Sequence, residues 1–314
     1  MEKRKMKLQK KSVVLLALLL AAMAMVPMVS AEENFSSSNV IGMKYFSNIP
    51  DNVKSQSSSQ FPLSEYSLIT VDSPEFMKDA DCGKTLELTL DGKPYSLHLT
   101  PQPSIIAPTA KLYIKTQEGT KVTDIPQIRQ YKGSVTGENE KGDAVFTVDK
   151  DVILGRISVN NESYFIEQSG IRNSGKIVHI VYNAKNEITR TKQPNTDDIY
   201  PMTISHSPIS VPDKKQIESV KAPLSTSTVT LLAVYDTQFQ SKFSSPSTEI
   251  ASMMSTAGNA FSPSYIGVNF QINSFVLDST LTRTSKDTLT TQLISSQSAN
   301  RDSTSSDLVL LSHR

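Results

Sequence analysis

The sequence predicts an α+β protein, in which an antiparallel β-rich domain precedes an incomplete α/β domain with the order βαβαβ and a mostly parallel sheet. Two observations predict this class. Across residues 84–183 apolar residues alternate with polar ones, which is the period of a half-buried strand. From residue 229 onward, strand-like apolar runs alternate with segments of helical period, which is typical of parallel βαβ units with right-handed crossovers.

The overall composition is that of a globular protein. The 314 residues are 38% hydrophobic and 20% charged, which leaves room for about two domains. Lys and Arg number 32 and Asp and Glu number 31, so no basic field attracts nucleic acid, and we expect no nucleic-acid partner. The composition leaves the oligomeric state open.

The first residues have the order of an export signal. Basic residues within 3–11 precede an apolar run at 13–26, and residues 29–31 supply the small side chains that signal peptidases accept. We therefore predict a signal peptide over residues 1–31, cleaved after Ala31, and a secreted or cell-envelope protein. The alternative is an uncleaved anchor. Because the apolar run is shorter than the span of about 20 residues that crosses a membrane, no stable membrane span is expected after cleavage.

Strand-like periodicity defines the first domain. Residues 32–60 are rich in Ser and Asn and are predicted to form a flexible leader, and residues 61–190 the β-rich domain. Leucines alternate with polar residues over 86–90, and Asp91 and Gly92 then form a turn pair, so a hairpin is expected there. Further strands, separated by Gly or Asn, are expected at residues 112–114, 131–135, 144–148, 152–159, 164–166 and 177–182.

A proline-rich connector over residues 191–227 separates this domain from the second, and its extended composition makes it a target for proteolysis. Residues 228–314 carry the α/β pattern, in which Ser245 can cap a helix whose first residue is Pro246. Strands are expected at residues 229–235, 268–272 and 308–311, and helices at residues 246–261 and 285–298.

The α/β segment is short. At about 85 residues it lies below the usual size of a self-sufficient domain of this class, so we expect only the N-terminal half of a domain. Its last strand, residues 308–311, would then lie at an exposed sheet edge. An exposed apolar edge strand favours aggregation.

Segments of both domains resemble one protein family. The second domain resembles the opening of the catalytic domain of the reprolysin-like (adamalysin-type) zinc metallopeptidases of the metzincin clan, and the first resembles the propeptide of that family. The segments in the second domain are TVTLLAVYDTQFQSKF (228–243), EIASMMSTAGNAF (249–261), IGVNFQINSF (266–275) and DLVLLSHR (307–314). Those in the first domain are YKGSVTG (131–137), DAVFTV (143–148), GRI (155–157) and YFIEQ (164–168).

The resemblance implies a secreted zinc metalloendopeptidase precursor, a zymogen whose prodomain covers the catalytic cleft until the connector is cut. The family binds zinc through His-Glu-x-x-His, followed by a glycine turn and a third histidine. None of the four histidines here is followed by Glu, and no two are four residues apart: they are His98, His179, His206 and His313. The chain as given is therefore expected to hold no zinc, catalytic or metal-ligating residue and to be inactive. Zinc and a protein or peptide substrate are expected only for a full-length version, and substrate specificity stays open.

Four further residues have a functional and a structural interpretation. Cys82, the single cysteine, is followed by Gly83 and resembles the cysteine switches in which a propeptide thiolate binds zinc. The alternative is a lone thiol in a turn, because the family's switch lies near the end of the propeptide. His98 lies on the polar side of its strand, and His179 lies between apolar residues, which favours packing. Asp236 ends a strand, where ligands bind in open α/β sheets but where a carboxylate also caps the next loop.

A different class stays open, namely a noncatalytic exported binding or adhesion module. An integrin-type adhesion site needs hydroxyls at the second and fourth positions after the aspartate, where this chain has Gln238 and Gln240. No glycine-rich phosphate loop and no Gly-x-Ser-x-Gly elbow occurs in the sequence. Nucleotide-binding and serine-hydrolase classes are therefore not predicted.

Overall fold

The computed structural model describes residues 41–49, 61–188, 227–261, 268–281 and 286–312. The chain divides into two units, 1–36 and 37–314, and every described residue belongs to the second. The predicted signal peptide with its cleavage after Ala31, most of the leader and nearly all of the connector lie outside the described residues, as do His206 and His313. The domain boundaries stay predictions.

Strands dominate the part of the chain that the structure describes. It holds fifteen strands, arranged in two sheets, and four α-helices. The predicted fold class, α+β with an incomplete metzincin-like α/β domain, is therefore wrong. Ten strands form one antiparallel sheet, and two strands from residues 112–123 join the three C-terminal strands in the second sheet. Pairing between strands far apart in sequence overrides the assignment that the local patterns favoured.

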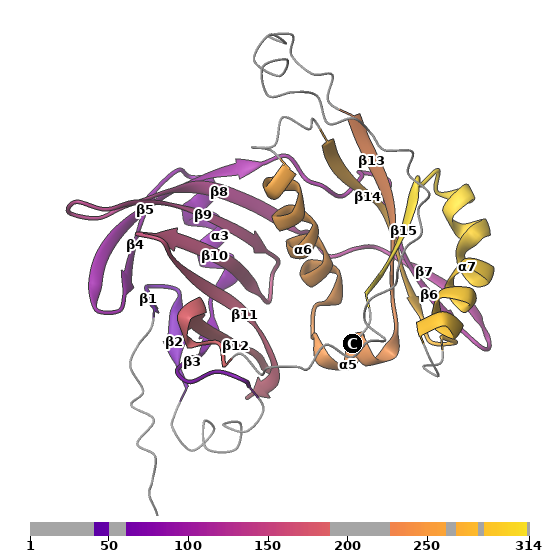
Figure 1. The fold of residues 1–314 in the computed structure, drawn as a ribbon, viewed down its shortest axis with the longest axis horizontal. Coiled ribbons are helices and arrows are strands. Elements are labelled where there is room, and N and C mark those ends of the chain that lie inside the picture. Colours follow the sequence, from indigo (N-terminus) through magenta and orange to yellow (C-terminus); the bar gives the residue numbers. More distant parts are fainter. Residues whose placement is uncertain (1–40, 50–60, 189–226, 262–267, 282–285, 313–314) are drawn as a thin grey trace, which may run out of the picture. The chain divides into compact units, whose positions relative to one another are not determined.

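Ten strands form the antiparallel sheet. They are β1 (Ile41–Met43), β2 (Phe46–Asn48), β3 (Ser67–Val71), β4 (Thr85–Leu90), β5 (Lys93–Gln102), β8 (Arg129–Thr136), β9 (Lys141–Val148), β10 (Ile153–Val159), β11 (Glu162–Asn173) and β12 (Lys176–Asn183). The order is β1-β4-β5-β8-β9-β10-β11-β12-β3-β2, and the strands curve strongly (Figure 1). The predicted hairpin is confirmed as the β4–β5 turn, in which Asp91 and Gly92 have φ angles of 47° and 80°.

Helix α3 (Ser73–Asp81) packs against one face of this sheet. The Asp72 carboxylate caps its first turn. Phe76 is fully buried, and its ring makes edge contacts with the rings of Tyr45 and Tyr131 at centroid distances of 5.4 and 6.0 Å. This helix was not predicted from the sequence, because only Phe76, Met77 and Ala80 of its nine residues are hydrophobic, although Phe76 and Ala80 lie one helical turn apart.

Five strands form the second sheet. They are β6 (Leu112–Thr116), β7 (Gly119–Thr123), β13 (Ser227–Tyr235), β14 (Val268–Asp278) and β15 (Leu308–Ser312). The order is β15-β13-β14-β6-β7, and only the β6–β7 pair is antiparallel. The three C-terminal strands are present and parallel as predicted. The strand predicted at 112–114 does not join the antiparallel sheet, because β6 pairs with β14. At the other edge lies β15, where the Leu308 residue is 54% exposed.

Three helices accompany the second sheet, namely α5 (Thr237–Lys242), α6 (Pro246–Phe261) and α7 (Lys286–Ser303). Ile250 of α6 packs with Phe275 of β14 in one apolar cluster, whereas Leu293 of α7 packs in another with Leu232 and Val276. The two helices therefore cover opposite faces of the sheet. Among the described residues, no helix has both the length and the apolar character needed to cross a membrane.

Candidate functional site

The structure does not bring the sequence-predicted site residues together. Cys82 is exposed at the C-cap of α3, next to Gly83 in a left-handed conformation (φ 66°). His98 is exposed on β5, with its Nδ1 3.2 Å from the Thr85 hydroxyl. Asp236 caps α5, since its carboxylate accepts the Phe239 N–H at 2.8 Å. In the described ranges no group of three His, Cys, Asp or Glu side chains is placed to hold a metal ion.

His179 is the most buried of the predicted candidates. It lies in β12 with an exposed fraction of 0%. Its Nε2 accepts the Ile153 N–H at 3.3 Å. Burial lowers the pKa of this imidazole to about 4, so His179 is neutral at physiological pH.

A different set of polar residues is brought together between the antiparallel sheet and the start of α6. We call Asp149, Gln168, Ser245, Thr248 and Glu249 the interface cluster. The first two belong to the N-terminal part (residues 41–188), and the other three to the C-terminal part (residues 227–312). Every member except Ser245 is buried, with an exposed fraction of 8% or less.

Both carboxylate oxygens of Asp149 accept hydrogen bonds. One oxygen accepts the backbone N–H groups of Asp151 and Val152 at 2.7 and 2.9 Å. The other accepts the hydroxyls of Ser245 and Thr248, the latter at 2.5 Å. A buried carboxylate is tolerated only when donors of this kind surround it. One side chain therefore ties the β9–β10 turn to the first turn of α6.

Gln168 makes the second connection, from β11. Its amide oxygen accepts the Ser245 N–H at 2.9 Å, and its amide nitrogen donates to a Glu249 carboxylate oxygen at 2.9 Å. Burial raises the pKa of Glu249 to about 7. The charge of Glu167 acts in the same direction, and the Gln168 hydrogen bond and the Lys242 charge oppose the shift. Near neutral pH this carboxyl group therefore takes up and releases a proton.

A third connection is formed by backbone atoms. The strand β6 pairs in parallel with β14, so that Leu112 lies opposite Phe275 and Ile114 opposite Leu277. The Phe275 N–H donates to the Lys111 carbonyl at 2.9 Å, and the Ile272 N–H donates to the Ile105 carbonyl at 2.6 Å. The N-terminal part thus contributes a hairpin, β6–β7, to the sheet of the C-terminal part.

Sequence reasoning missed the interface cluster because its members are 77 or more residues apart across the connector. Ser245 was identified only as a helix cap. The signal that could have found Asp149 is the Asp-Lys-Asp sequence at a strand turn, but a carboxylate there usually caps only its own turn. No spacing rule links such a turn to a distant helix.

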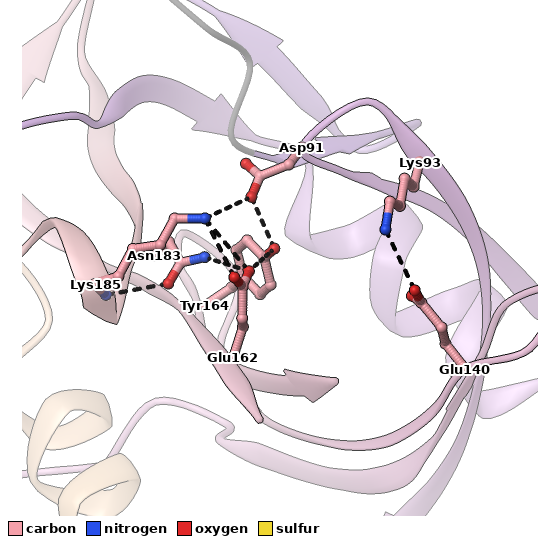
Figure 2. Close-up of polar contacts among 7 residues, drawn as sticks. All are labelled: Asp91, Lys93, Glu140, Glu162, Tyr164, Asn183 and Lys185. Carbon is pink, nitrogen blue, oxygen red and sulfur yellow. Dashed lines mark hydrogen bonds and ion pairs between the residues drawn. The ribbon is translucent and has the colours of Figure 1, made fainter. Parts of the chain in front are cut away.

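A second polar cluster serves the antiparallel sheet itself (Figure 2). The Tyr164 hydroxyl lies 2.9 Å from an Asp91 carboxylate oxygen and 2.8 Å from one of Glu162. The Asn183 amide donates to Glu162 at 2.8 Å, and the Lys185 ammonium group approaches both carboxylates. Burial, followed by these carboxylates, raises the pKa of Tyr164. The contacts join the β4–β5 turn to the start of β11.

We expect Tyr164→Phe to lower the free energy of unfolding by about 1 kcal/mol, because the phenol loses its hydrogen bond to a carboxylate in a partly buried position. The measurement is urea denaturation followed by far-UV circular dichroism, since the chain has no Trp. Tyr113→Phe in β6 is the matched control and should change stability by less than about 0.5 kcal/mol. An equal effect of both substitutions would refute the structural role of this cluster.

No protein-family model matches this chain, and no curated protein is found to match it.

Proposed function

We propose that this chain is a precursor of a secreted zinc metallopeptidase, in which the N-terminal part acts as a propeptide that keeps the C-terminal part assembled. The resemblance of the segments around residues 131–168 and 228–314 supports the family. The observation that carries the propeptide role is the donated hairpin, because β6 fills the edge of β14 that the C-terminal part would otherwise leave unpaired.

Edge filling of this kind has a clear physical benefit. An unpaired parallel strand exposes a row of backbone N–H and C=O groups, which promotes aggregation. The hairpin also brings Leu112 and Ile114 onto the apolar cluster that contains Phe275. Together with the interface cluster, these residues give the N-terminal part both apolar and polar contacts with the C-terminal part. Zinc and a peptide substrate belong, in this proposal, to a full-length form.

The test is to cut the connector and ask whether the two parts stay together. A site for a specific protease is inserted within residues 191–226 of the whole chain, and the cut protein is examined by size-exclusion chromatography. The two fragments should co-elute. Elution as separate fragments would contradict the propeptide role and favour the alternative of a noncatalytic binding module.

A pair of substitutions tests whether the β6–β7 hairpin keeps the two fragments associated. Ile114→Asp places a carboxylate against the apolar cluster, which costs several kcal/mol, so the cut fragments should separate. Val122→Asp in β7 is the control, because Val122 is 52% exposed and the fragments should still co-elute. If both variants behave alike, the donated strand is not what holds the two parts together.

The peptidase assignment has its own test. The reading frame beyond residue 314 in the source gene should encode His-Glu-x-x-His, followed by glycine and a third histidine. Unrelated coding sequence there would contradict the assignment as a zinc peptidase. It would not affect the role of the hairpin, which the cutting experiment tests separately.

A further inference from the structure

A groove of about 730 Å³ lies between α6 and the face of the antiparallel sheet that β10 and β11 present to it. Its apolar walls include Leu154, Phe165 and Met253, the last of which is 46% exposed. Ligand sites in proteins typically have volumes of about 300–1,000 Å³ and are mostly apolar with a few polar groups. The size and the lining of this groove therefore fit a small organic molecule.

The polar groups of the groove are two carboxyl groups, one guanidinium group and two hydroxyls. Glu249 and Glu167 both line it. Arg156 also lines the groove, but its guanidinium group faces the carboxylate of Asp143 at 3.4 Å, so its charge is balanced. The Lys242 ammonium group, on α5, lies 4.6 Å from the centre of the Phe243 ring and outside the groove lining. The two glutamates thus leave the groove with an excess of negative charge when both are ionised.

We propose that this groove binds an organic cation with an apolar body, whose ammonium or guanidinium group lies between Glu249 and Glu167 and whose body lies along Leu154, Phe165 and Met253. Charge complementarity selects the cation, because a buried carboxylate gains most from a positive group that also donates hydrogen bonds. When both glutamates are ionised, an anion of the same size would face two carboxylates. A neutral molecule would leave the glutamates without a new partner.

The site makes a specific thermodynamic prediction. The buried Glu249 carboxyl group, with a pKa of about 7, is mostly protonated at slightly acidic pH. A bound cation favours the ionised form, so binding should release a proton to the buffer. Glu167 and Lys242 are the other charged groups that influence this carboxyl group, and burial also raises the pKa of Glu167, against a hydrogen bond from Tyr182 and the charge of Lys242.

The experiment is isothermal titration of the purified chain with octylamine at about pH 6, in two buffers that differ in ionisation enthalpy. We expect saturable binding with the release of close to one proton. Octanoate and octanol, which have the same apolar length, should bind at least about tenfold more weakly. Octylamine that fails to bind at about 1 mM, or that binds no better than octanol, would overturn the proposal.

Three variants localise the site. Glu249→Gln preserves shape and should reduce octylamine affinity about tenfold and remove most of the proton release. Glu167→Gln changes a residue that is exposed in the structure, and it should also weaken binding. Glu118→Gln, in the β6–β7 turn, is the control and should bind as the parent does. Full affinity in both Glu249→Gln and Glu167→Gln would show that the amine binds elsewhere, which would overturn the proposal.

Discussion

Asp149→Ala is expected to lower the free energy of unfolding by about 3–4 kcal/mol, because it removes the acceptor for four donors at once. The Val152 N–H is buried and would lose this acceptor, and the buried Thr248 hydroxyl would keep its contact with the Ser245 hydroxyl at 2.9 Å. A buried donor without an acceptor costs about 1–3 kcal/mol. The loss falls on the contact between the β9–β10 turn and α6, so both parts of the chain should be affected.

Urea denaturation measures this effect, and limited proteolysis shows where it acts. Asp151→Ala is the matched control, because that side chain is exposed and forms a surface pair with Lys150, and it should change stability by less than about 0.5 kcal/mol. In Asp149→Ala the start of α6 should become sensitive to protease before the antiparallel sheet unfolds. A variant as stable as the Asp151→Ala control would refute the role that we assign to Asp149.

Glu249→Gln is expected to remove a pH dependence of stability. In the folded chain burial raises the pKa of Glu249 from 4.5 to about 7. A raised carboxyl pKa means that the folded state holds the proton more tightly than the unfolded state does. The corresponding stability is fully present below about pH 4.5 and is lost as the pH rises through about 7. The parent protein should therefore be less stable at mildly alkaline than at mildly acidic pH.

The size of this effect follows from the shift. Between about pH 5 and about pH 8 the parent should lose about 2–3 kcal/mol more than Glu249→Gln, since one pKa unit corresponds to about 1.4 kcal/mol. The comparison must be made between the two proteins at each pH. His179, whose buried imidazole has a pKa of about 4, destabilises both proteins equally as the pH falls below its unfolded value. Parallel pH profiles for the two proteins would contradict the prediction.

Several local elements could be predicted from the sequence. The β4–β5 hairpin follows from the alternating leucines over 86–90 and from Asp91 and Gly92, which adopt positive φ at the turn. The start of α6 at Pro246 is as predicted, whereas the Ser245 hydroxyl contacts the side chains of Asp149 and Thr248. In each case a few neighbouring residues decide the structure, because turn conformation and helix capping depend on side chains within one turn of the chain.

Other elements could not be predicted, for two different reasons. Helix α3 is short and mostly polar, and tertiary contacts stabilise it: Phe76 is buried under the antiparallel sheet, and Asp79 pairs with Lys44 and Lys84. The residues of the hairpin β6–β7 are compatible with strands, but the residue pattern of a strand does not determine which sheet the strand joins. Assigning it to the nearer sheet contributed to the wrong fold class, since β6 pairs with β14 more than 150 residues away.

The candidate site depends almost wholly on tertiary structure. The sequence supplied a capping serine and a turn aspartate, but not their mutual contact, and it offered no sign that Glu249 would be buried beside Gln168. The structure does not bring the predicted residues Cys82, His98 and Asp236 together in one site.

By itself, then, the sequence determined where most strands and helices of this protein form, since period, turn residues and caps act over a few residues. Tertiary structure alone decided which strands share a sheet, how β6 completes the C-terminal sheet and which polar side chains meet at α6. The reason is physical: pairing and burial depend on which distant surfaces can cover one another, and that free energy is not a property of any short segment.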